Sequence, residues 1–148
     1  MDKIKFMRSA LKQAEIALKR DEVPIGAVIV KDGKIISRGY NKRQQTKNAI
    51  NHAEIIAIQK ATKVIGDWRL ENCDIYITLE PCPMCLGAIA NARIKNVYFG
   101  AYDKNSKINY CDLILKDTRL NHKCNVEGGL LEDSCSQILS IFFKNKRK

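Results

Sequence analysis

Four side chains in two short segments can together bind a metal ion and move protons. His52 and Glu54 lie two residues apart, and Cys82 and Cys85 lie three apart within the segment 81–85, Pro-Cys-Pro-Met-Cys. One imidazole and two thiolates are three ligands, the number with which a catalytic zinc leaves its fourth position open to water. We therefore expect His52, Cys82 and Cys85 to hold one zinc ion per chain and Glu54 to accept and return protons beside it.

Other uses of the metal-binding side chains have less support. A structural zinc is normally closed by a fourth cysteine or histidine, and none stands at the usual spacing. The same ligands also accept iron or cobalt, so zinc rests on the general preference of such sites. His122 with Cys124 is a weaker candidate for a second metal site. Four cysteines are expected to be small buried side chains: Cys73, Cys111, Cys124 and Cys135.

The local elements must bring these ligands together. Residues two apart do not share a helix face, so His52 must stand at the start of a helix and Glu54 in its first turn. Apolar spacing predicts a helix over 52–64 and another from 84 to about 92, with Cys82 at its cap and Cys85 in its first turn. Helix N-termini lower thiol pKa values, so we expect both sulfurs to be ionised at neutral pH, between two helix N-termini.

The remaining elements predict one α/β domain over residues 1–148. Apolar residues at helical spacing predict a helix over 4–20 and a last helix over 130–144. Asp32-Gly33 favours a hairpin between strands 23–31 and 34–40, and further strands are expected over 74–79, 96–101 and 123–127. This order implies a three-layer α/β/α sandwich around a five-stranded mixed sheet, with no secure assignment for 104–122.

Charge and hydropathy narrow the class of partner. Lys and Arg number 26 against 16 Asp and Glu, giving a net charge of +10 that suits a polyanion such as nucleic acid. The apolar stretches are far shorter than the roughly 20 residues that a membrane helix needs, and residues 1–20 are too charged for a signal peptide. We therefore expect a cytoplasmic protein with no membrane partner.

Beyond these residues, nearly the whole chain resembles one family of enzymes. The H-x-E and P-C-x-x-C pattern is that of zinc-dependent base deaminases. Further segments resemble the bacterial tRNA-specific adenosine deaminases, which belong to the cytidine deaminase superfamily and convert the wobble adenosine of an anticodon to inosine. They are Glu22–Val28, Arg38–Asn41, His52–Ile55, Asp67–Leu70, Thr78–Cys82 and Val97–Ala101.

The resemblance implies a fold of the cytidine deaminase type and a hydrolytic deamination in which zinc activates a water and Glu54 shuttles protons. It also implies that Asn41 hydrogen-bonds a flipped adenosine, that Ile25 lines its pocket, that Asp103 contacts a sugar, and that Phe143 touches the RNA. The partners implied are a tRNA anticodon stem-loop and a second copy of the chain in a homodimer, with no organic cofactor. The alternatives are that Asn41 only closes the hairpin and that Phe143 belongs to the core.

Two features separate this chain from that family. Family members carry a run of small residues that includes glycine after the position of Asp103. This chain instead reads Lys-Asn-Ser-Lys-Ile-Asn-Tyr-Cys over residues 104–111, which leaves the path of the RNA over this loop open. The segment Cys82–Ile89 also resembles guanine deaminases of the same fold, so deamination of free guanine is the alternative activity. A non-catalytic RNA-binding partner subunit is a third hypothesis, but the intact Glu54 argues against it.

Overall fold

The computed structural model describes residues 2–117, 119–120 and 122–146, so the predicted domain boundaries at 1 and 148 lie outside the described residues. The elements follow the predicted order, with two additions. The helices are α1 (Lys3–Lys19), α2 (Arg43–Thr46), α3 (Ala53–Ile65), α4 (Pro83–Asn91), the π-helix η1 (Cys111–Leu115) and α5 (Glu132–Lys146). The strands are β1 (Gly26–Lys31), β2 (Lys34–Tyr40), β3 (Cys73–Leu79), β4 (Asn96–Ala101) and β5 (Asn125–Glu127).

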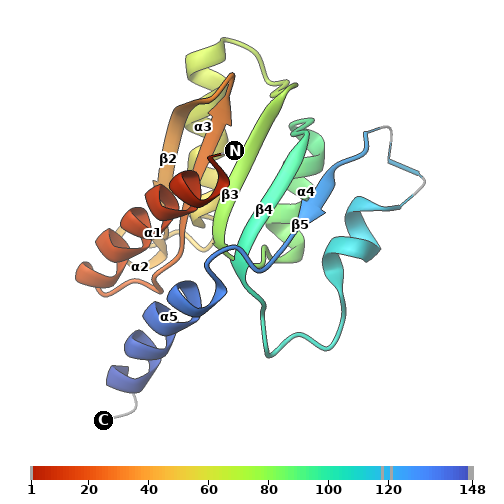
Figure 1. Ribbon diagram of the computed structural model, residues 1–148. Helices are drawn as coiled ribbons and strands as arrows, with labels where there is room; N and C mark the ends of the chain where they lie inside the picture. The colour runs from red at the N-terminus through yellow and green to blue at the C-terminus, as the bar shows by residue number, and fades with distance from the viewer. Residues whose placement is uncertain (1, 118, 121, 147–148) are drawn as a thin grey trace.

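The five strands form one mixed sheet in the order β2-β1-β3-β4-β5. β1 pairs antiparallel with β2 and with β3, whereas the β3–β4 and β4–β5 pairs are parallel. In Figure 1, α1 and α5 lie in front of this sheet and α3 and α4 lie behind it. The predicted three-layer α/β/α sandwich with a five-stranded mixed sheet is therefore confirmed.

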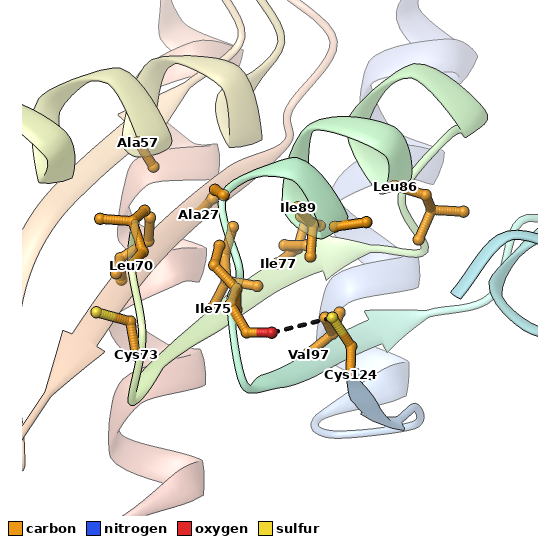
Figure 2. Close-up of a cluster of buried hydrophobic side chains, with 14 of the residues drawn as sticks. Ala27, Ala57, Leu70, Cys73, Ile75, Ile77, Leu86, Ile89, Val97 and Cys124 are labelled. Atoms are coloured by element: carbon orange, nitrogen blue, oxygen red, sulfur yellow. Dashed lines mark hydrogen bonds between the residues drawn. The ribbon is translucent and has the colours of Figure 1, made fainter. Parts of the chain in front are cut away.

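Alternate strand residues face the two helical layers and create two cores. The core under α3 and α4 contains the strand residues Ala27, Ile29, Ile75, Ile77, Val97 and Phe99. The core under α1 and α5 contains Val28, Val30, Tyr76 and Ala101. Because side chains of a strand alternate between faces, strands that read as continuous apolar runs fill both layers. Figure 2 shows the first core and the bond from Cys124 Sγ to the Ile94 carbonyl.

The hairpin forms as predicted, but its first strand is shorter. Asp32 and Gly33 both have positive φ, as a tight turn between twisted antiparallel strands requires. β1 begins at Gly26 instead of residue 23 because the preceding residues turn: the Ile25 N–H donates to the Val23 carbonyl at 2.8 Å, and Pro24 has no N–H to pair. This turn brings Ile25 next to the end of β2.

The last helix also begins later than its apolar pattern suggests. The N–H groups of Gly129 and Leu130 donate to the Gly100 and Phe99 carbonyls, so this backbone extends along β4 before α5 starts at Glu132. None of the helices within residues 2–146, as far as they are described, is long and apolar enough to cross a membrane.

Candidate metal centre and substrate site

Two helix N-termini meet at the candidate site. His52 is the N-cap of α3 with an extended backbone, and Glu54 lies in the first turn of that helix. Cys82 is the N-cap of α4, where Pro83 begins the helix and Cys85 follows in its first turn. Proline suits the first helical position because the N–H that it lacks would have no helical partner there. The structure thus has the predicted helix starts.

The three predicted ligand atoms lie within reach of a single ion. The Nδ1 atom of His52 is 3.7 Å from Cys82 Sγ and 3.6 Å from Cys85 Sγ. All three atoms lie within 4.8 Å of one another, and this is the one group of three or more possible metal ligands among the described residues. Ligands 30 or more residues apart in the chain are therefore joined by the fold.

The two sulfurs respond oppositely to their surroundings. A hydrogen bond from Cys85 and a weaker one from His52 lower the pKa of the Cys82 thiol to about 4. The hydrogen bond to Cys82 and burial together raise the pKa of Cys85. The expectation that both sulfurs are ionised therefore needs a further condition: a second thiolate beside the first requires a cation between them.

Glu54 is a buried carboxylate that faces this group. Its side chain is 4 % exposed, and burial raises the pKa of its carboxyl group. Its Oε1 atom has no hydrogen-bond partner among the described residues. An unpartnered buried oxygen is costly in a folded protein, so its presence beside three metal ligands indicates that it serves a bound molecule.

These residues fit a zinc ion. Cysteine and histidine are the donors that zinc prefers, and three of them make a catalytic set in which one position stays open. The unpartnered Glu54 oxygen belongs to the same helix start as the ligand His52, where a carboxylate can act as a proton acceptor.

The predicted substrate residue Asn41 is hydrogen-bonded to the start of α3, and Ile25 is hydrogen-bonded to Asn41. Asn41 is buried, and its Oδ1 accepts the Ala53 N–H at 2.9 Å. Its backbone N–H donates to the Ile25 carbonyl at 3.2 Å. Asn41 thus does help to close the end of the hairpin, yet its Nδ2 is left to donate to a ligand.

The other two predicted substrate residues line a cavity that the metal ligands do not border. Asp103 and Phe143 both border a cavity of about 590 Å³, together with Val23 and Leu79. Leu79 precedes the ligand Cys82 by three residues in the chain, but Cys82 itself is not among the residues that line this cavity. Phe142 is buried in the core, whereas Phe143 is 46 % exposed and free to meet a ligand.

Sequence reasoning did not identify Glu80 as a residue of this site. Its Oε1 accepts the Asp103 N–H at 3.0 Å, and its own N–H donates to the Ala101 carbonyl at 2.9 Å. Glu80 therefore ties the loop that carries Asp103 to the connection that carries Cys82. Glu80 and Asp103 follow the ends of the parallel strands β3 and β4, and no spacing rule links such residues, so the sequence held no signal for this contact.

The weaker candidate for a second metal site does not form one. His122 Nε2 lies 2.6 Å from the Ile94 carbonyl, and Cys124 Sγ donates to the same oxygen at 2.9 Å. Both side chains therefore bind a backbone carbonyl oxygen. Burial raises the pKa of the Cys124 thiol to about 11, so it stays protonated near neutral pH.

Comparison with known proteins gives consistent matches over nearly the whole chain. The family model of the MafB19-like deaminases matches residues 1–147. A tRNA-specific adenosine deaminase of Streptococcus pyogenes serotype M18 is 49 % identical over 146 residues, which are 97 % of this chain and 91 % of that protein.

Two solved structures bear on the choice between activities. A structure from work on tRNA:A34 deaminases superposes with a TM-score of 0.84 and 41 % identity, covering 90 % of this chain and 98 % of the other. A Bacillus subtilis guanine deaminase superposes with a TM-score of 0.63 and 44 % identity, but covers only 66 % of this chain and 63 % of the other. The first likeness therefore extends over more of the molecule.

Proposed function

Because the chain belongs to the MafB19-like deaminase family and, within it, to the tRNA-specific adenosine deaminases, we propose that it deaminates the wobble adenosine of a tRNA anticodon to inosine. The reaction consumes one water, breaks the bond between the ring carbon and its exocyclic nitrogen, and releases ammonia. The observation that carries this proposal is the convergence of His52, Cys82 and Cys85 beside the buried carboxylate of Glu54.

His52 Nδ1, Cys82 Sγ and Cys85 Sγ would hold one zinc ion per subunit. When bound, zinc lowers the pKa of a water molecule so that the water loses a proton near neutral pH. The N-terminus of α4 supports the negative charge of the sulfurs, because its N–H groups and dipole point at them.

Glu54 moves the protons of the reaction. Its unpartnered Oε1 accepts one proton from the attacking water and delivers it to the ring nitrogen of the base. It then takes the second proton from the newly added hydroxyl group and delivers it to the departing amino group, which leaves as ammonia. Burial raises the pKa of this carboxyl group, so its protonated form is less unfavourable than that of an exposed glutamate. A single carboxyl group can therefore serve as base and as acid within one turnover.

Four further residues bind the RNA in this proposal. Asn41 donates from Nδ2 to the flipped adenine, and Ile25 packs beside it because their backbones are hydrogen-bonded. Asp103 and Phe143, which line the 590 Å³ cavity, meet a sugar and a base next to the target. Lys104 and Lys144 border the same cavity and would neutralise neighbouring phosphates.

The wider setting follows from the same assignment. The net charge of +10 suits a tRNA anticodon stem-loop as the partner. We further propose that residues 1–148 form one zinc-dependent domain, that two copies form a homodimer, and that the enzyme acts in the cytoplasm, where tRNA is found.

The experiment compares three substrates with the zinc-loaded protein: an anticodon stem-loop with a wobble adenosine, free guanine, and cytidine. Ammonia release is measured for all three and inosine in the stem-loop. Inosine in the stem-loop alone is the expected result. Turnover of guanine with an inert stem-loop would move the chain to the guanine deaminases, and no turnover of any substrate would favour a non-catalytic partner subunit.

Glu54→Gln tests the proton shuttle, with Glu15→Gln on the exposed side of α1 as the control. The Glu54 variant should keep its zinc and lose turnover, because an amide cannot accept and return a proton. A variant that keeps both zinc and full turnover would remove Glu54 from the mechanism.

A further inference from the structure

Glu22 is a buried carboxylate for which the proposed chemistry has no use. It is 2 % exposed and, with Glu54, is one of two charged side chains buried in the described chain. Its Oε1 accepts the Gln44 N–H at 3.1 Å, and its Oε2 accepts the Gln45 N–H at 2.7 Å. A buried charge without hydrogen bonds is strongly unfavourable, so these two backbone donors keep the carboxylate in place.

The two donors belong to α2, a helix that cannot be stable by itself. α2 has four residues, and such short helices do not form in isolation. Lys42 occupies its N-cap and makes no side-chain cap. Gln44 and Gln45 carry the N–H groups that an N-cap oxygen normally accepts. Glu22, 22 residues before Gln44, supplies those oxygens from another part of the chain.

α2 begins a basic loop beside the candidate site. The loop, residues 42–50, joins Asn41 to Asn51 and His52, and residues 43–50 are exposed. The loop contains three cations, Lys42, Arg43 and Lys47. Because Ile50 at the end of the loop is followed directly by Asn51 and His52, the loop adjoins the first metal ligand.

The base of this loop is closed independently of Glu22. The Lys42 N–H donates to the Asn51 carbonyl at 3.0 Å, and Asn51 Nδ2 donates to Thr46 Oγ1 at 2.7 Å. Asn41 is also fixed by its own bond to the Ala53 N–H. Loss of the Glu22 contact should therefore loosen α2 and its cations while Asn41 and His52 stay in place.

We propose that Glu22 is a positioning residue that caps α2 from a distance and so presents Lys42, Arg43 and Lys47 to the phosphates of the bound RNA. This inference rests on the proposed function for the identity of the ligand. The residues that directly follow Glu22 strengthen it, because Val23 lines the cavity and Ile25 contacts Asn41. One carboxylate thus joins the two segments that flank the substrate.

The variants are Glu22→Ala and Glu22→Gln, with Glu15→Ala and Glu15→Gln on the exposed side of α1 as matched controls. Amide hydrogen exchange at Gln44 and Gln45 reports the cap. Fluorescence anisotropy of a labelled anticodon stem-loop gives its Kd, and inosine formation gives kcat and KM. Zinc content and the unfolding midpoint report the integrity of the protein.

Glu22→Ala should speed exchange at both amides and raise Kd and KM by about tenfold, the effect of losing a helix cap. Zinc content should be unchanged and kcat should change less than KM. Glu22→Gln, which keeps the side-chain volume and one acceptor oxygen, should show a smaller change in the same direction and provides the comparison if the alanine variant does not fold.

A local cap should rescue the alanine variant. Asparagine is a good N-cap and alanine a poor one, and both remove the charge of Lys42. We therefore expect Glu22→Ala/Lys42→Asn to recover slow exchange and tighter RNA binding relative to Glu22→Ala/Lys42→Ala.

Three results would overturn the inference. Unchanged exchange in both Glu22 variants would mean that there is no distant cap. Faster exchange with unchanged Kd and KM would mean that α2 has only a structural role. A wild-type protein that does not bind the stem-loop would mean that RNA is not the ligand to which α2 presents its cations. A wild-type protein that binds the stem-loop without forming inosine would instead refute the proposed function, and the Kd values would still decide the role of Glu22.

Discussion

Replacing Gly39 by alanine tests whether the contact between β2 and α3 sets the geometry of the candidate metal centre. A Cβ atom at Gly39 would lie 2.4 Å from the Ala53 carbonyl oxygen and 2.9 Å from the Ala57 nitrogen. Ordinary contacts of a Cβ atom begin near 3.4 Å. Both obstacles are backbone atoms, so no side-chain rotation can relieve the clash, and the first turn of α3 must retreat by about 1 Å.

That retreat would displace the catalytic groups directly. Ala53 stands between His52, a proposed ligand, and Glu54, the proposed proton shuttle. A misplacement of about 1 Å can cost about 100-fold in rate, and overpacking of a core costs about 1–3 kcal/mol of stability. We therefore expect kcat/KM for the stem-loop to fall by about 100-fold and the free energy of unfolding to fall by about 2 kcal/mol.

The assay measures inosine formation at several stem-loop concentrations, zinc content and urea unfolding of the same preparation. Gly87→Ala is the control, because a Cβ atom at Gly87, inside α4, would meet nothing within 4 Å. This variant should be more stable by up to about 1 kcal/mol, since alanine favours helix over glycine. A Gly39→Ala protein with kcat/KM within twofold of the wild type would refute the reasoning.

Three further perturbations separate charge, burial and packing. If about four phosphates of a single-stranded loop are contacted, the logarithm of stem-loop affinity should fall with a slope near −3 against the logarithm of salt concentration, and a slope near zero would contradict RNA binding. Burial raises the pKa of the Cys135 and Cys111 thiols to about 12 and that of Cys124 to about 11, against 9 for an ordinary thiol. The protonated thiols therefore stabilise the folded state fully below pH 9, and this stabilisation is lost as pH rises toward 11–12. The urea midpoint should fall over that window, and it should fall less steeply in Cys135→Ala. Equal slopes for the variant and the wild type would contradict this role of the buried thiol. Met7→Ala should cost about 2–5 kcal/mol in urea unfolding, because Met7 is fully buried on the face of α1 that packs against the sheet. A loss below about 1 kcal/mol would show that this core closes around the gap.

Elements with a strong local pattern were predictable from the sequence. Asp32-Gly33 needs positive φ at both turn positions, and the structure has it. The starts of α3 and α4 were also predictable, because the spacing of His52 and Glu54 and the proline after Cys82 allow few other arrangements. The structure has both starts as predicted.

Short elements held by distant contacts were not predictable. α2 has no capping side chain of its own and depends on Glu22, so neither its composition nor its periodicity marks it as a helix. The π-helix η1 is five residues long and packs Cys111 and Leu115 into the core. No spacing rule for α-helices or strands describes that turn, which is why residues 104–122 received no secure assignment.

The sequence by itself determined which atoms can bind a metal ion and which helix ends carry them, because ligand chemistry and helix starts depend on residue type and near neighbours. Only the tertiary structure decided that the imidazole and the two sulfurs lie within 4.8 Å of one another and that Glu54 is buried with a free oxygen beside them. Those facts depend on the order β2-β1-β3-β4 and on how closely α3 packs against β2 at Gly39. Contacts between residues 30 or more positions apart form only when the whole sheet does.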